Sequence, residues 1–167
     1  MKIKKIKLKN FRNYDDLDLN FAKSLNVFVG KNAQGKTNIL ESIYFSALGK
    51  SFRICKDKEI IKWNKENGKS EIEFENRFRN KKIEVFLLKN QKKSIKIDKI
   101  SIKKIGSLLG ELTVVFFSPD ELRLIKDSPD ERRRFMNINI SQTDKKYFYL
   151  LSRYEKILQN RKQGIYL

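Results

Sequence analysis

The residues with the clearest chemical meaning form one glycine-rich segment, Gly30-Lys31-Asn32-Ala33-Gln34-Gly35-Lys36-Thr37. The pattern G-x-x-x-x-G-K-[S/T] is that of a phosphate-binding loop. Its two glycines allow the backbone to turn successive N–H groups toward phosphate oxygens. Lys36 supplies a cation for the β and γ phosphates, and the Thr37 hydroxyl is a ligand for Mg²⁺. The segment therefore predicts a site for a nucleoside triphosphate with Mg²⁺.

The residues on either side are those that position such a loop. Residues 25–29 form a short, mostly apolar run, which predicts a strand buried on both faces. After the loop, apolar residues recur at helical spacing, and Gly49 is suited to end that helix. The alternative, a glycine-containing loop with an incidental lysine, does not account for this strand–loop–helix order.

Glu41 lies four residues after Thr37 on the same predicted helix. We interpret it as a solvated or salt-bridged carboxylate, because P-loop ATPases normally take their catalytic acid from a Walker B strand, an apolar run ending in Asp. The apolar run of residues 112–117 predicts another buried strand, but it ends in Ser118-Pro119-Asp120, where the acid suits the first turn of a helix. We expect the chain to bind a nucleoside triphosphate without hydrolysing it.

The composition favours a nucleic-acid partner and excludes several other classes of function. The net charge is +18, with 38 basic residues, although a lysine-rich chain also accommodates many lysines as dispersed, solvated side chains. The arginines Arg132-Arg133-Arg134 are clustered, and they are suited either to contact DNA phosphates or to pair with Asp130 and Glu131. Histidine is absent and Cys55 is the only cysteine, which excludes histidine chemistry and an internal disulfide. With no secretory signal or apolar span, a cytoplasmic location is expected.

The periodicity of the chain divides it into two regions. Up to residue 118, period-two patterns predict antiparallel strands, with a short helix over residues 102–109 ended by Gly110. From residue 119 the pattern is helical, with starts at Ser118-Pro119 and Ser128-Pro129 and one helix over about residues 141–163. We predict an α/β domain over residues 1–118 and the beginning of a helical lobe over residues 119–167. The strands are expected over residues 2–9, 17–21, 72–78, 83–87 and 95–97.

Four ordered motifs make the chain resemble the N-terminal part of the RecF family of repair ATPases, related to SMC and Rad50 heads. They are Leu8-Lys9-Asn10-Phe11-Arg12-Asn13-Tyr14, the loop continued by Leu40-Glu41-Ser42-Ile43-Tyr44, Val114-Val115-Phe116-Phe117-Ser118-Pro119-Asp120, and Ser128-Pro129 with Arg132-Arg133-Arg134-Phe135.

The resemblance implies an ABC-type P-loop head with a mixed sheet, in which Arg12 and Asn13 lie near bound ATP. It also implies a role in recombinational repair and replication restart at single-strand gaps, with RecO and RecR as partners. The expected nucleic-acid ligand is double-stranded DNA or a junction of single and double strands. An ATP-dependent homodimer is expected only for a full-length form.

The family pattern is not matched throughout. Members of the family are about twice as long, and no Walker B or signature motif is recognised in this sequence. We therefore expect a fragment of a longer protein or a truncated gene product. A different class of function, a basic nucleic-acid-binding module with a vestigial loop, is the alternative.

Overall fold

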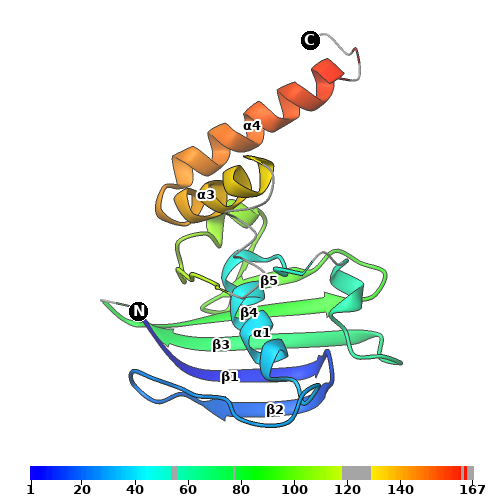
Figure 1. Cartoon of the computed structure of the whole chain (residues 1–167), viewed down its shortest axis with the longest axis vertical. Helices are drawn as coiled ribbons and strands as arrows, with labels where there is room; N and C mark the ends of the chain where they lie inside the picture. The colour runs from blue at the N-terminus through cyan, green and yellow to red at the C-terminus, as the bar shows by residue number, and fades with distance from the viewer. Residues whose placement is uncertain (54–55, 77, 118–128, 163, 165–167) are drawn as a thin grey trace. The chain divides into compact units, whose positions relative to one another are not determined.

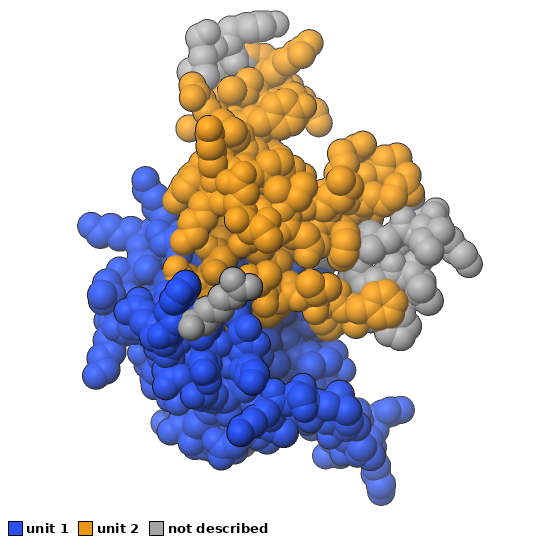
Figure 2. All heavy atoms as spheres, turned by 90° about the vertical axis from the view of Figure 1, so that its left-hand side faces the viewer, with its two compact units in different colours: residues 1–108 blue, residues 109–167 orange. Residues whose placement is uncertain are grey.

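The computed structural model describes residues 1–53, 56–76, 78–117, 129–162 and 164. These form two compact units, Met1–Leu108 and Leu109–Leu167, coloured separately in Figure 2. The domain boundary predicted near residue 118 and the helix start at Ser118-Pro119 lie outside the described residues.

An antiparallel six-stranded sheet forms the first unit, in the order β2-β1-β3-β4-β5-β6 (Figure 1). Strands are found where they were predicted over residues 2–9, 17–21, 83–87 and 95–97. The strand predicted over residues 72–78 ends at Glu75, and the strand at residues 100–102 was not predicted. The strands are β1 (Lys2–Phe11), β2 (Tyr14–Asn20), β3 (Asn67–Glu75), β4 (Asn80–Leu88), β5 (Ser94–Ile97) and β6 (Ile100–Ile102).

One face of the sheet is apolar and is covered by helix α1 (Lys36–Leu48), as Figure 1 shows. Ile6, Ile72 and Ile83 are paired in register across β1, β3 and β4, and each is at most 1% exposed. Phe45 of α1 is fully buried and meets Phe11 edge to face at 6.3 Å. Alternation of apolar and polar residues therefore fixes both the register and the face on which α1 packs.

The opposite face of the sheet carries alternating charges that pair across strands. Lys5 lies 2.8 Å from Asp18, and Lys69 bridges Glu71 and Glu84. Burial raises the pKa of Glu71, but hydrogen bonds from Lys69 and Lys82 outweigh it and hold that pKa below 4.5. On this face the lysines are neutralised by neighbouring carboxylates.

Two apolar runs predicted as buried strands are not strands, which corrects the sequence interpretation. Residues 25–29 contain no strand, and Val27 is 72% and Val29 90% exposed. Residues 113–117 likewise contain no strand, and Phe117 is 71% exposed. A strand requires a hydrogen-bonded neighbouring strand, and neither segment is part of the described sheet.

The short connections also differ from the prediction in one place. The helix expected over residues 102–109 is instead the end of strand β6 followed by a single 3₁₀ turn, η2 (Ile105–Ser107). Another 3₁₀ turn, η1 (Asp57–Glu59), precedes β3. Gly49 does end α1 in the left-handed conformation, with φ 67°, as the sequence predicted.

Two helices, α3 (Pro129–Thr143) and α4 (Lys145–Lys162), dominate the second unit. The single helix predicted over residues 141–163 is wrong because the chain breaks at Asp144. The Asp144 carboxylate accepts hydrogen bonds from the backbone N–H groups of Lys146 and Tyr147, at 2.8 and 3.2 Å, and so caps α4. Within the same unit, the side-chain amide of Gln142 bonds both backbone groups of Val114, at 2.8 and 3.0 Å.

Candidate phosphate-binding site

The backbone of the glycine-rich loop turns sharply before it enters α1. Ala33 and Gly35 are both left-handed, with φ 64° and 100°. Gly35 is buried, and a Cβ atom there would lie 2.7 Å from both Asn13 Nδ2 and Tyr14 Oη. Partial burial raises the pKa of Tyr14 above 10.0, so its hydroxyl is protonated at neutral pH. The left-handed conformation therefore favours glycine at position 35, and a larger residue would also have to displace the ends of the Asn13 and Tyr14 side chains.

The N-terminus of α1 has no cap of its own. Gly35 occupies the capping position, no side chain bonds the first turn, and that turn contains no acid. The N–H groups of Asn38 and Ile39 bond the Gly35 carbonyl, at 2.8 and 3.2 Å. The positive end of the helix dipole is thus available to an anion.

Lys36 reaches back over the loop. Its ammonium donates to the carbonyl oxygens of Gly30 and Lys31, at 2.6 and 2.7 Å. Thr37 follows it and is exposed at the start of α1, as a magnesium ligand would have to be. The remaining predicted loop residues are exposed, namely Gly30, Lys31, Asn32, Ala33 and Gln34.

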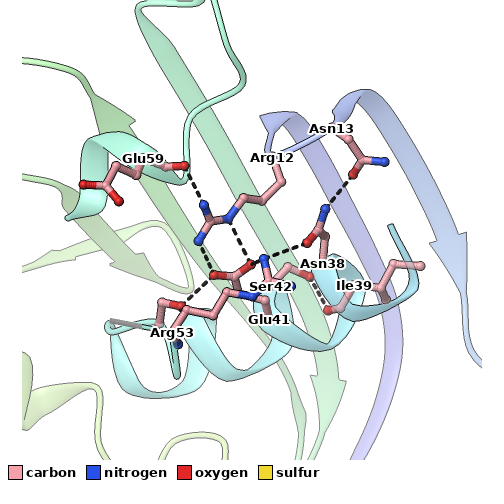
Figure 3. Close-up of polar contacts among 9 residues, drawn as sticks. Arg12, Asn13, Asn38, Ile39, Glu41, Ser42, Arg53 and Glu59 are labelled. Atoms are coloured by element: carbon pink, nitrogen blue, oxygen red, sulfur yellow. Dashed lines mark hydrogen bonds and ion pairs between the residues drawn. The ribbon is translucent and has the colours of Figure 1, made fainter. Parts of the chain in front are cut away.

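Arg12 and Asn13 form the turn between β1 and β2, and their side chains form hydrogen bonds with different residues (Figure 3). Asn13 stands beside Gly35 and accepts a hydrogen bond of 2.8 Å from the Asn38 side chain. The Arg12 guanidinium instead bonds the Glu41 carboxylate through Nε and Nη2, at 3.0 and 2.6 Å. Contact of either residue with a nucleotide stays a prediction.

Glu41 is the residue whose environment the sequence did not define. Its side chain is fully buried, and beside Arg12 it accepts hydrogen bonds from Ser51 Oγ at 2.6 Å and Arg53 Nη1 at 3.0 Å. The salt-bridged form of the sequence interpretation is correct and the solvated form is wrong. These partners lie 29, 10 and 12 residues away, so no helical spacing marks them. The sequence signals are indirect: Arg12 and Glu41 lie in two of the family motifs, and Ser51 and Arg53 follow soon after the helix stop at Gly49.

The described residues contain no group of three or more His, Cys, Asp or Glu side chains placed to hold a metal ion. A Mg²⁺ ion bound by phosphate oxygens and the Thr37 hydroxyl does not require such a group. Among the helices described, none is long and apolar enough to cross a membrane.

Comparison with known proteins gives a consistent family. A model described as an AAA domain matches residues 5–164. The DNA replication and repair protein RecF of Clostridium botulinum is 49% identical over 99% of this chain, and that of Clostridium acetobutylicum is 48% identical over 96%. The chain spans 45% and 44% of these two relatives' lengths.

Solved structures agree with the sequence relatives. A structure of the recombination mediator protein RecF with ATP is 37% identical, with a TM-score of 0.91 over 97% of this chain and 44% of its own. An SMC ATPase structure at 22% identity shares the fold, with a TM-score of 0.68 over 83% of this chain and 99% of its own. The chain has the P-loop ATPase fold of RecF and SMC heads and belongs to the AAA-domain family, within it to the RecF group.

Proposed function

We propose that residues 30–37 bind ATP with Mg²⁺. The observation that carries the proposal is the start of α1: a glycine-capped helix end with no side-chain cap, over which Lys36 already lies. Gly35 turns the loop with a positive φ, and the Asn13 side chain lies beside it. An anion of the size of a triphosphate fits the chemistry of these donors.

Each residue has a defined part in this proposal. The uncapped first turn of α1 supplies N–H donors, and Lys36 neutralises the β and γ phosphates. Thr37 offers its hydroxyl to Mg²⁺, which offsets the remaining phosphate charge when bound. Asn13 stands at the edge of the loop, while Arg12 is held by Glu41 and acts at a distance.

A calorimetric titration with ATP–Mg²⁺ tests the proposal directly. Lys36→Ala should weaken binding by roughly tenfold to a hundredfold, because a charged hydrogen bond contributes roughly 1.5–3 kcal/mol. Lys58→Ala, in η1, is the matched control for the loss of one positive charge and should bind like the wild type. Equal affinity of wild type and Lys36→Ala would remove the proposal.

We further propose that this chain binds nucleotide without turning it over. No Walker B motif is recognised in the sequence, and the relatives it matches are about twice as long. Phosphate release by the purified chain should equal that of Lys36→Ala. Turnover that disappears in Lys36→Ala would contradict this.

The repair role is proposed from the relatives. RecF is described in solved structures as a recombination mediator of the RecFOR pathway. We propose that this chain acts in the same process in the cytoplasm, with RecO, RecR and DNA, and that ATP-dependent dimerisation belongs to a longer form.

Charge distribution supports a DNA contact on the first unit. Residues 1–108 contain 27 basic and 12 acidic side chains, which leaves +15 of the net +18. Lys99, Lys103 and Lys104 are exposed and form no ion pair within the described part of the chain. Arg133 and Arg134 instead lie beside acids of their own helix, Asp130 and Glu131, which favours the pairing interpretation of the arginine cluster.

The alternative, a basic module with a vestigial loop, is favoured by the same charge. A salt series of duplex-DNA binding with and without ATP–Mg²⁺ separates the two. Both predict affinity that falls with salt. Only the RecF-type proposal predicts that ATP changes it.

A further inference from the structure

A buried carboxylate stands at the centre of the polar cluster beside the loop. The Glu41 side chain is 0% exposed, whereas its partners Arg12 and Arg53 are 17% and 38% exposed. The guanidinium groups of Arg12 and Arg53 converge on its two oxygens (Figure 3). The Ser51 hydroxyl also donates to one of these oxygens. A buried carboxylate stays charged only when cations and hydrogen-bond donors replace the water around it. The Glu41 carboxylate therefore restricts the positions of the groups that donate to it.

The cluster continues to the loop through side-chain hydrogen bonds. Arg53 Nη1, which bonds Glu41, also donates to Asn38 Oδ1 at 3.0 Å. Asn38 Nδ2 donates to Asn13 Oδ1 at 2.8 Å, and Asn13 lies against Gly35. A continuous path therefore joins the buried carboxylate to the glycine on which α1 begins.

The same carboxylate fixes the turn on the other side of the site. Arg12 is left-handed, with φ 53°, a conformation that an arginine adopts only under constraint. Its guanidinium bonds both Glu41 oxygens and the Glu59 carbonyl, the last at 2.7 Å. Since Arg12 and Asn13 are adjacent, fixing one restricts the other.

We propose that Glu41 is a positioning residue for the phosphate-binding loop. Its charge holds Arg12 and Arg53, and these hold Asn13 and Asn38 against the loop so that it has its binding shape before the ligand arrives. The inference rests on the proposed nucleotide function and adds to it a residue that touches neither phosphate nor metal.

Glu41→Gln tests the proposal, because it keeps the size of the side chain and removes its charge. Circular dichroism gives the folded fraction of the variant, and the ATP–Mg²⁺ affinity is calculated for that fraction. This affinity should fall about tenfold. Glu84→Gln is the matched control: it is also a salt-bridged carboxylate of the first unit, but it lies on the opposite face of the sheet. Its affinity should equal that of the wild type.

A second readout does not depend on nucleotide. The backbone amide resonance of Gly35 in the ligand-free protein should shift in Glu41→Gln and stay in place in Glu84→Gln. If Glu41→Gln does not fold, Asn38→Ala interrupts the same path between Arg53 and Asn13. It should shift the same resonance and weaken ATP binding.

The outcomes separate the two proposals. Folded Glu41→Gln, or in its place Asn38→Ala, with wild-type affinity and an unmoved Gly35 resonance overturns the positioning role. Tighter binding by Glu41→Gln also overturns it, since the carboxylate would then act only as a repulsive charge. Wild-type protein that binds no ATP removes the nucleotide function, and the Gly35 resonance alone then decides whether Glu41 positions the loop.

Discussion

Helices α1 and α4 begin in opposite ways. At the start of α4, the Asp144 carboxylate accepts hydrogen bonds from two backbone N–H groups of the first turn. At the start of α1, Gly35 has no side chain, and no acid lies in the first turn. The start of α4 is therefore capped by a residue of the chain. The start of α1 has N–H donors and a lysine, but no acidic side chain that accepts from them.

Under the proposed function, this difference separates a helix start that is only structural from one that binds an anion. A protein that stabilised every helix to the same degree would place an Asp, Asn, Ser or Thr before α1, as it does before α4. Leaving that end uncapped costs stability and is consistent with an anionic ligand that completes it. Four predictions test how far the contrast holds.

The largest effect is expected at Gly35. Gly35→Ala should abolish measurable ATP binding and lower the free energy of unfolding by roughly 1–3 kcal/mol. The added Cβ would meet Asn13, and the alanine would have to adopt the positive φ of Gly35. Urea unfolding and calorimetry measure the two effects. Gly164→Ala is the control, with φ 69° and nothing within 4 Å of the added atom. Binding by Gly35→Ala at wild-type strength would break the comparison.

Lys36 is expected to give the next effect. Lys36→Ala should weaken ATP binding by roughly tenfold to a hundredfold. The free energy of unfolding should change by less than about 1 kcal/mol, since the lysine bonds only exposed loop carbonyls. A large loss of stability with unchanged binding would mean that Lys36 is a structural clamp.

Asp144 should show the reverse pattern. Asp144→Ala should lower the free energy of unfolding by about 1 kcal/mol and leave ATP affinity unchanged. Asp144→Asn retains an acceptor for Lys146 and Tyr147 and should restore most of the stability. Thermal unfolding followed by circular dichroism measures both variants, and a stable Asp144→Ala would show that α4 begins without its cap.

The smallest effect is expected from acid. The pKa of Glu71 is held below 4.5 in the folded chain, so its stabilisation is complete above pH 4.5 and is lost as the pH falls through the lower folded value. Wild type and Glu71→Gln should differ by less than about 1 kcal/mol at pH 7 and converge in strong acid. Melting temperatures between pH 7 and 3 measure this, and a constant difference would contradict it.

The sequence predicts local features of this molecule better than those that depend on distant partners. Period-two alternation identified five of the six sheet strands but not β6, and the glycine–lysine pattern placed the loop before α1, because both signals lie within a few residues. Residues 25–29 were wrongly predicted as a buried strand, since an apolar run does not specify its neighbour. Asp144 is of a residue type that commonly caps helices, but the helical pattern on both sides of it predicted one continuous helix.

The candidate site shows the same limit. The loop residues follow from a motif, whereas the Glu41 cluster joins positions up to 29 residues apart. Burial converts Glu41 from an ordinary helix acid into the counter-ion of two arginines, and burial is a property of the folded chain. Only the structure brings Arg53 and Asn38 into contact.

The Lys36 ammonium has a consequence for how tightly the loop holds a ligand. Its hydrogen bonds to the Gly30 and Lys31 carbonyls are contacts within the loop itself. Under the proposed function, phosphate oxygens would have to replace these two carbonyl partners, so only the difference between the two sets of contacts would contribute to affinity.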